Sequence, residues 1–250
     1  MTVALETIGL HRRFGGLIAT NEVSLRLQRG ARHALIGPNG AGKTTLINLL
    51  SGVLRPTAGR ILLDGDDITR LRPDQRVHRG LVRTFQINQL FPELTPLMTV
   101  GLAVSRRLGL DRQIWRRIGS RAAVIDESVA VLERFDLIRV MNQPTAALPY
   151  GRQRLLEIAA AIACAPRVLL LDEPAAGVPE AERDGILAGV AALPQEVTVL
   201  LIEHDMDLVF RFAERISVLV NGAVLVEGTP AEIAADARVR EVYLGRSEHG

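Results

Sequence analysis

The order of apolar and polar positions predicts strands in the first third of the chain, helices in the middle, and both in alternation toward the end. Strands are predicted over residues 3–10, 23–28, 32–36, 60–63 and near 81–85, with a helix that begins at residue 44. Between about residues 88 and 148 the pattern is mostly helical, and no clear strand is found.

From residue 151 onward helices and strands alternate. Helices are predicted over 151–164, near 180–193 and over 206–213, with strands over 168–171 and 197–202. This alternation indicates a parallel sheet with helices packed on it. The last helix is expected to begin at Thr229-Pro230-Ala231-Glu232, which reads as a capping box with proline at the first helical position. We therefore expect one α/β domain over 1–250, with a core from 1–87 and 151–250 and an inserted helical subdomain over 88–150.

Composition excludes several classes of protein. With 250 residues and 48% apolar residues, the chain is long enough for one large domain with a substantial core. A formal charge of +2 gives no support to nucleic-acid binding by bulk charge, so no nucleic-acid partner is expected. Cys164 is the only cysteine, which excludes an internal disulfide framework. Neither a membrane-spanning run nor a signal peptide is predicted.

The use of basic residues is uneven in a way that bears on function. Of the 30 basic residues, 29 are arginine, and the single lysine is Lys43. A genome with biased base composition, which encodes arginine wherever arginine or lysine would serve, explains the many arginines. A lysine kept under that bias indicates a position where a compact ammonium is needed and a broad guanidinium does not serve.

Lys43 lies in a phosphate-binding pattern, because residues 37–45 read Gly-Pro-Asn-Gly-Ala-Gly-Lys-Thr-Thr and stand between a predicted strand and a predicted helix. Glycines let the backbone curl so that N–H groups point inward at an anion. Lys43 would reach the β- and γ-phosphates and the Thr44 hydroxyl would bind Mg²⁺. No second lysine exists to build an Asn-Lys-x-Asp guanine site, which favours ATP. The expected nucleotide-binding residues of this loop are Gly37, Pro38, Asn39, Gly40, Ala41, Gly42, Lys43, Thr44 and Thr45.

Acidic residues follow the predicted strand at 168–171. Such an apolar run fits a central strand buried on both faces, and ligands bind at the carboxyl ends of strands in open α/β sheets. Asp172 is placed to support Mg²⁺, and Glu173 to face an attacking water. His204 follows the next predicted strand, where an imidazole could hydrogen-bond the γ-phosphate.

With these motifs in order, the chain resembles the ATP-binding subunits of ABC transporters along nearly its whole length. The resemblance implies a P-loop NTPase core with a parallel sheet, an N-terminal antiparallel β subdomain and the inserted helical subdomain. It matches Phe14 to the aromatic that stacks on adenine, and Gln86 to the glutamine expected at the metal and in the catalytic site. The signature motif, expected to contact the ATP of a partner chain, falls on Leu148, Pro149, Tyr150, Gly151 and Arg152.

A closer resemblance is to the ATPases of branched-chain (Liv-type) amino-acid importers, and importers of urea, amides or aromatic acids share much of the pattern. It implies a head-to-tail dimer with a second ABC ATPase chain, as a homodimer or a heterodimer. It also implies transmembrane permease subunits, an indirect link to an extracytoplasmic solute-binding protein, and a peripheral location on the cytoplasmic face of the bacterial inner membrane.

The chain departs from the family pattern at three positions. Pro149 and Arg152 replace the signature serine and glutamine, and Pro179 stands near the usual D-loop acid. One hypothesis is that this chain's own ATP site is competent when a suitable partner is present. The alternatives are a soluble ABC ATPase acting on nucleic acid or the ribosome, and a nucleotide-binding scaffold with weak hydrolysis.

A basic stretch in the helical segment is open to two interpretations. One is a solvated helical face in an arginine-rich chain. The other is contact with anionic headgroups or with loops of membrane subunits. The stretch consists of Arg106, Arg107, Arg112, Arg116, Arg117 and Arg121.

Overall fold

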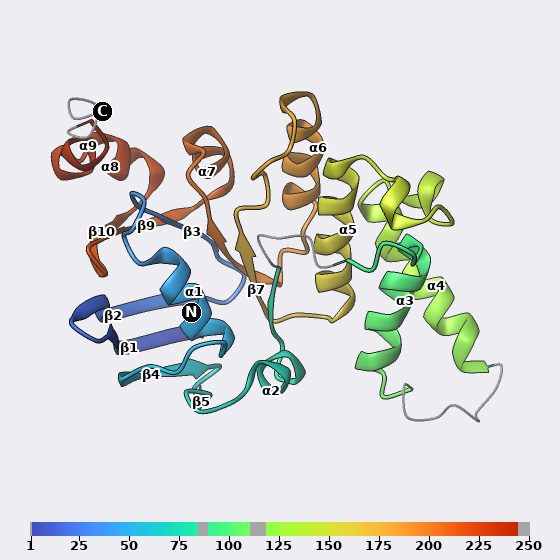
Figure 1. Cartoon of the computed structure of the whole chain (residues 1–250), viewed down its shortest axis with the longest axis horizontal. Helices are drawn as coiled ribbons and strands as arrows, with labels where there is room; N and C mark the ends of the chain where they lie inside the picture. Colours follow the sequence, from blue (N-terminus) through green and yellow to red (C-terminus); the bar gives the residue numbers. More distant parts are fainter. Residues whose placement is uncertain (1, 85–89, 111–118, 245–250) are drawn as a thin grey trace. The chain divides into compact units, whose positions relative to one another are not determined.

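The computed structural model describes residues 2–84, 90–110 and 119–244 (Figure 1). Two compact units make up the chain. The first, here called the core unit, comprises Met1–Leu81, Arg167–Glu173 and Gln195–Gly250. The second, here called the helical unit, comprises Val82–Pro166 and Pro174–Pro194. Both units are therefore built from segments that are far apart in the sequence.

An antiparallel sheet forms the first part of the core unit. Its strand order is β2-β1-β4-β5. The strands are β1 (Val3–Phe14), β2 (Leu17–Gln28), β4 (Ala58–Leu63) and β5 (Asp66–Asp67). The two long strands β1 and β2 pair along their whole length, with Val3 opposite Gln28 and Phe14 opposite Leu17.

A larger, mostly parallel sheet has the strand order β10-β9-β3-β8-β7-β6. Pairing is parallel between β3 and β8, β3 and β9, and β7 and β8, whereas β9 and β10 form an antiparallel hairpin. Every residue of β7 and β8 is buried, as expected of central strands covered on both faces. The strands are β3 (Arg32–Ile36), β6 (Leu81–Arg83), β7 (Val168–Asp172), β8 (Thr198–Ile202), β9 (Arg215–Val220) and β10 (Ala223–Gly228).

Helix α1 (Lys43–Ser51) ties the two sheets of the core unit together. Its Leu46, Leu49 and Leu50 belong to one buried cluster with Leu25 of β2 and Leu200 of β8. Burial of each such side chain contributes about 1.5–3 kcal/mol. A second cluster packs beneath the last helices of the unit, which are α7 (Met206–Phe212), α8 (Pro230–Ala235) and α9 (Ala237–Leu244).

The helical unit is a group of helices in mutual contact. Helix α5 packs on α3, α4 and α6 (Figure 1). The elements are α3 (Pro96–Arg107), α4 (Gly119–Arg134), the short 3₁₀ helices η1 (Ile138–Val140) and η2 (Thr145–Ala147), α5 (Tyr150–Ala163) and α6 (Glu180–Ala191). Across the described ranges, none of the helices has both the length and the apolar character that crossing a bilayer requires.

Within the basic stretch, only part can be placed. Arg107 forms an ion pair with Glu127, and its Nε donates to the Ala163 carbonyl at 3.1 Å. Arg112, Arg116 and Arg117 lie outside the described residues. Arg107 therefore has a structural role on the surface of the helical unit, and the contact of this stretch with headgroups or membrane subunits stays a prediction.

The predicted fold class is confirmed, with a mixed sheet, an antiparallel β part and a group of helices, although several elements differ from expectation. Strands β9 and β10 were not predicted, although Asn221-Gly222 between two apolar runs is a strong hairpin signal. The helix expected from residue 229 is α8, with the predicted capping box, but it is not the last one. It ends at Ala235 and α9 follows. Phe85, at the end of the strand predicted near 81–85, lies outside the described residues.

A buried arginine on α2 (Pro73–His78) holds the far end of α1. The Arg76 guanidinium is 1% exposed and donates to the carbonyls of Leu49 and Leu50 at 2.7 and 2.6 Å. It also donates to the carbonyls of Thr69 and Leu71. Burial lowers the pKa of Arg76 to about 10, so the group keeps its charge at neutral pH. One side chain thereby donates to two carbonyls at the C-terminus of α1, where a helix leaves such groups with few partners.

Replacing Arg76 tests this network. We expect Arg76→Met to lower the free energy of unfolding by about 3 kcal/mol, because the carbonyls of residues 49, 50, 69 and 71 would each lose a charged donor. The measurement is a urea unfolding midpoint, with Arg79→Met at the exposed end of α2 as the matched control. Equal midpoints for the two variants would show that the network adds nothing to stability.

Candidate nucleotide-binding site

The loop between β3 and α1 has a backbone that only glycine can follow at its last turn. Gly42 adopts a left-handed conformation, with φ at +101°, directly before α1. A Cβ atom on Gly42 would lie 2.3 Å from the carbonyl oxygen of Ala19 on β2. Gly40 also has a positive φ, of +80°, but a Cβ there would meet nothing within 4 Å. The loop therefore curls tightly against β2 at Gly42 and is open at Gly40.

Two backbone hydrogen bonds in series clamp this loop to the β9–β10 turn and, through that turn, to β2. The Gly222 N–H, in the β9–β10 turn, donates to the Ala41 carbonyl at 2.9 Å. The Asn21 N–H on β2 in turn donates to the Gly222 carbonyl at 2.8 Å. Helix α1 has no side-chain cap at its N-terminus. A curled loop that leads into an uncapped helix N-terminus presents N–H groups and a positive dipole, which suits an anion such as a phosphate chain.

Lys43 is buried at the base of this loop. Its ammonium donates to the carbonyls of Gly37 at 2.5 Å and Pro38 at 3.1 Å. Burial lowers the pKa of Lys43, and the carboxylates of Glu173 and Asp172 act against that shift. This effect of the two acids agrees with their place at the end of β7, in the same sheet as β3. Thr44 is exposed on the first turn of α1, so its hydroxyl is available to a ligand at the loop.

The two acids stand at the carboxyl end of β7. Asp172 is buried and lies opposite Ile202 of β8 in the parallel register. Glu173 follows with φ at +45°, and its N–H donates to the Ile202 carbonyl at 2.9 Å. A glutamate in this left-handed region costs about 1 kcal/mol, and such strain gathers at functional sites. The backbone turn therefore aims Glu173 away from the direction that a regular strand would give it.

His204 lies beside Glu173, at the end of the neighbouring strand. Its Nδ1 is 3.7 Å from a carboxylate oxygen of Glu173 and 3.7 Å from one of Glu203. Glu203 is 1% exposed and accepts hydrogen bonds from the N–H groups of His204 and Asp205 at 2.9 and 3.3 Å. The Asp205 side chain caps α7. The His204 imidazole is exposed, and the hydrogen bonds to Glu203 fix the backbone that carries it.

Phe14, predicted to stack on adenine, stands at the end of β1. The guanidinium of Arg12 lies over its ring, 4.6 Å from the ring centre. Phe14 remains 41% exposed, so part of the ring is open to a base. The β1–β2 hairpin that carries Phe14 also carries Ala19, whose carbonyl abuts Gly42. The aromatic side chain and the phosphate loop are therefore linked through one hairpin.

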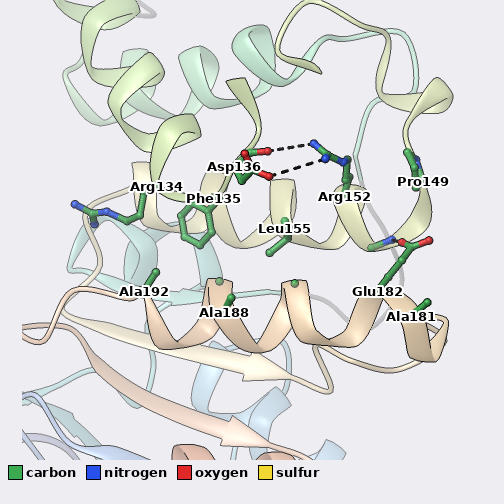
Figure 2. A pocket seen from close by; sticks show the side chains of 13 residues that line it. Arg134, Phe135, Asp136, Pro149, Arg152, Leu155, Ala181, Glu182, Ala188 and Ala192 are labelled. Carbon is green, nitrogen blue, oxygen red and sulfur yellow. Dashed lines mark hydrogen bonds and ion pairs between the residues drawn. The ribbon is translucent and has the colours of Figure 1, made fainter. Parts of the chain in front are cut away.

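The predicted signature residues lie in the helical unit, at the start of α5. Leu148 is buried, and the exposed Pro149 precedes the first turn of the helix. The Tyr150 ring is under the guanidinium of Arg154, at 5.2 Å from the ring centre. Arg152 donates to the Asp136 carbonyl at 3.1 Å and lies 4.0 Å from its carboxylate (Figure 2). Arg152 is therefore engaged within its own unit.

The structure brings Lys43, Asp172, Glu173 and His204 together within the core unit. Gln86 lies outside the described residues. Our sequence reasoning gave no role to two acids. Glu203, which fixes the backbone at His204, could have been found as a second acid directly after a buried strand. Glu182 of α6 accepts a hydrogen bond from the Gly151 N–H at 2.7 Å, and no local pattern links residues so far apart.

Comparison with known families agrees with this geometry. Residues 20–176, more than half of the chain, match the family described as ABC transporter. Residues 223–249 match the family described as branched-chain amino acid ATP-binding cassette transporter.

Individual proteins are similar over nearly the whole chain. BraF of Pseudomonas aeruginosa, a high-affinity branched-chain amino acid transport ATP-binding protein, is 43% identical and covers 97% of this chain and 98% of its own. LivG of Escherichia coli, described in the same words, is 40% identical over 97% of this chain and 98% of its own.

Among solved structures, an ABC transporter cassette in its ADP conformation gives a TM-score of 0.84 at 29% identity, covering 98% of this chain and all of that one. A bacterial ABC transporter cassette solved as a dimer gives 0.74 at 25% identity, covering 90% and 98%.

The chain belongs to the ABC transporter family, and it is an ATP-hydrolysing cassette with the fold of that family. Within the family it is of the branched-chain amino acid transport type, the type of LivG and BraF. The predicted family and the predicted ATPase class are both confirmed.

The glycine geometry gives a matched pair of variants. We expect Gly42→Ala to weaken ADP and ATP binding by about 100-fold or more, because its Cβ meets the Ala19 carbonyl and the loop must open. Gly40→Ala, which adds only a strained φ, should weaken binding by about tenfold or less. Calorimetric titration of each variant measures both affinities, and similar losses at the two positions would contradict a special role for the close approach of Gly42 to Ala19.

Proposed function

We propose that this chain powers the uptake of branched-chain amino acids, as the ATPase subunit of an importer at the cytoplasmic face of the bacterial inner membrane. The observation that carries the ATPase part is the buried Lys43 ammonium beside two strand-end carboxylates. Support for the solute comes from the names of BraF and LivG, which cover nearly the same length of chain. Nothing in the ATPase chain is expected to contact the solute itself.

Binding of MgATP follows from the loop. Backbone N–H groups of the loop after Pro38 and the N-terminus of α1 hold the phosphates. The Lys43 ammonium moves from the Gly37 and Pro38 carbonyls to the β- and γ-phosphates, which are stronger acceptors because they are charged. Thr44, Asp172 and Gln86 are the proposed ligands of Mg²⁺, which neutralises phosphate charge when bound.

Hydrolysis uses the acid and the imidazole beside the loop. Glu173 accepts a proton from the attacking water, and its turned backbone directs the carboxylate out of the strand. His204 donates a hydrogen bond to the γ-phosphate, while Glu203 holds its backbone in place. His204 Nδ1 and the Glu173 carboxylate oxygen are 3.7 Å apart, so a single water molecule can hydrogen-bond to both side chains.

A second cassette completes the site. We propose a head-to-tail dimer, as a homodimer or with a different ABC chain, in which residues 148–152 approach the ATP of the partner. The dimeric structure of a similar bacterial cassette supports the pairing of two cassettes. Phe14 is the proposed adenine contact within this chain. The signature lacks a serine hydroxyl at Pro149, so backbone N–H groups must carry more of the contact to phosphate.

The permease subunits need a docking surface, and α3 offers an exposed apolar stripe. Met98 and Leu102 lie one turn apart and are each 56% exposed. Phe91, just before the helix, is 65% exposed. Apolar side chains that gather on one exposed surface mark interaction sites. We propose that this stripe binds the permease subunits, through which the chain communicates with an extracytoplasmic solute-binding protein.

Removing the proposed base tests catalysis. We expect Glu173→Gln to lower ATP turnover of the assembled transporter by about 10²–10⁴-fold, because the amide cannot take the proton. ATP binding should persist. Turnover by phosphate release and affinity by calorimetry are both measured, with Glu133→Gln on exposed α4 as the control. Undiminished turnover would reject the role of Glu173, and an inactive wild-type complex would favour the scaffold alternative.

Charge placed on the α3 stripe tests docking. The double change Met98→Glu and Leu102→Glu should abolish co-purification with the permease subunits, because binding would bury two carboxylates. ATP binding by the isolated chain should be unchanged. Val53→Glu, at a comparably exposed apolar position of the core unit, is the control. Retention of the double variant on the permease would place the docking surface elsewhere.

A further inference from the structure

The first turn of the signature helix is capped by a residue from another helix. Pro149, at the N-cap position of α5, has no polar side-chain atom and makes no cap hydrogen bond. The Gly151 N–H instead donates to a carboxylate oxygen of Glu182 at 2.7 Å. Figure 2 shows the Glu182 side chain rising from α6 toward this turn. A helix N-terminus leaves N–H groups without intrahelical partners, and a carboxylate is a strong acceptor for one of them.

The contact depends on glycine at position 151. A Cβ atom there would lie 2.4 Å from the Glu182 carboxylate oxygen and 3.0 Å from the Glu182 Cβ. Any larger residue would therefore push the carboxylate off the amide. Glu182 itself belongs to the first turn of α6. The N-termini of two helices, α5 and α6, thus face the same carboxylate.

The same amide is needed elsewhere under the proposed function. In the dimer proposed above, the first turn of α5 approaches the triphosphate of the partner's ATP. One N–H directs its hydrogen to one acceptor at a time with good geometry. Phosphate oxygens and the Glu182 carboxylate are both anionic, so they compete for the amide and also repel each other. The carboxylate must leave before the phosphate can bind.

We propose that Glu182 is a positioning residue that holds the signature helix through the Gly151 amide until the partner's ATP displaces it. The inference rests on the proposed function, because the competing anion is the partner's nucleotide. Displacement of Glu182 costs free energy, and this cost weakens the binding of ATP across the dimer. The wild-type transporter therefore needs a higher ATP concentration to close than it would without this carboxylate.

A groove beside the turn can receive the displaced side chain. It lies between α5 and α6 with a volume of about 600 Å³, and Glu182 forms part of its wall (Figure 2). Arg152, which is bonded to Asp136, lines the same groove. Leu155 and Ala188 supply apolar lining. The carboxylate thus has space and a nearby cation within its own unit after it leaves the amide.

The test compares Glu182→Gln and Glu182→Ala with Glu180→Gln. Glu180 is exposed on the same turn of α6, so its variant removes an equal charge without touching the Gly151 amide. Hydrogen exchange of the Gly151 amide is measured by NMR on the full chain without nucleotide. We expect Glu182→Ala to speed exchange by about tenfold or more, as loss of a charged hydrogen bond predicts, with no change in the control. Exchange at the wild-type rate in Glu182→Ala would show that no cap exists.

The second readout is ATPase activity of the assembled transporter. We expect Glu182→Gln to lower KM for MgATP by about three- to tenfold while kcat stays within about twofold, since charge repulsion is removed but a weaker acceptor remains. A fall in kcat with unchanged KM would make Glu182 a merely structural cap and overturn the inference. If the wild-type complex lacks ATP turnover that depends on Glu173, the proposed function fails, and the competition between Glu182 and ATP fails with it. The hydrogen-exchange data would still show whether Glu182 caps the helix.

Discussion

Every part of the site depends on how tightly the backbone can turn between β3 and α1. The turn exists because Gly42 can face the Ala19 carbonyl without a side chain between them. Were this contact opened, the amide groups of the loop would lose their common direction, and the anion site they form would be lost with it. A hydrogen bond from the Gly222 N–H of the β9–β10 turn to the Ala41 carbonyl fixes the same stretch. The loop is therefore preorganised by main-chain contacts, which cost no side-chain entropy when a nucleotide arrives.

Electrostatics in the core unit follows from that geometry. Lys43 is buried because the loop folds over it, and burial of an ammonium is tolerated only with partners. The carbonyls of Gly37 and Pro38 serve as partners, and the acids at the end of β7 add favourable charge. A triphosphate offers the same ammonium stronger acceptors. The Lys43 ammonium can therefore exchange its carbonyl partners for phosphate oxygens with little movement of the chain.

Much of this site could be predicted from the sequence, because most of its functional residues lie in short contiguous motifs. The loop at 37–45 and the acids that follow a buried apolar strand were visible as local patterns, and so was the alternation that builds a parallel sheet. The hairpin of β9 and β10 was missed although its turn signal is local. The clamp at Gly222 was out of reach, since it depends on how β9 pairs with the distant strand β3. The bond from Gly151 to Glu182 was equally out of reach, because its geometry exists only once α5 and α6 are packed. Gln86 stays a prediction from resemblance.

The clamp at Gly222 has a consequence for the part of the chain that distinguishes this type of transporter. The family-specific match over residues 223–249 starts one residue after the glycine whose N–H holds Ala41. A displacement of the β9–β10 hairpin would thus reach the phosphate loop through main-chain contacts, namely the Gly222 amide on Ala41 and the pairing of β9 with β3.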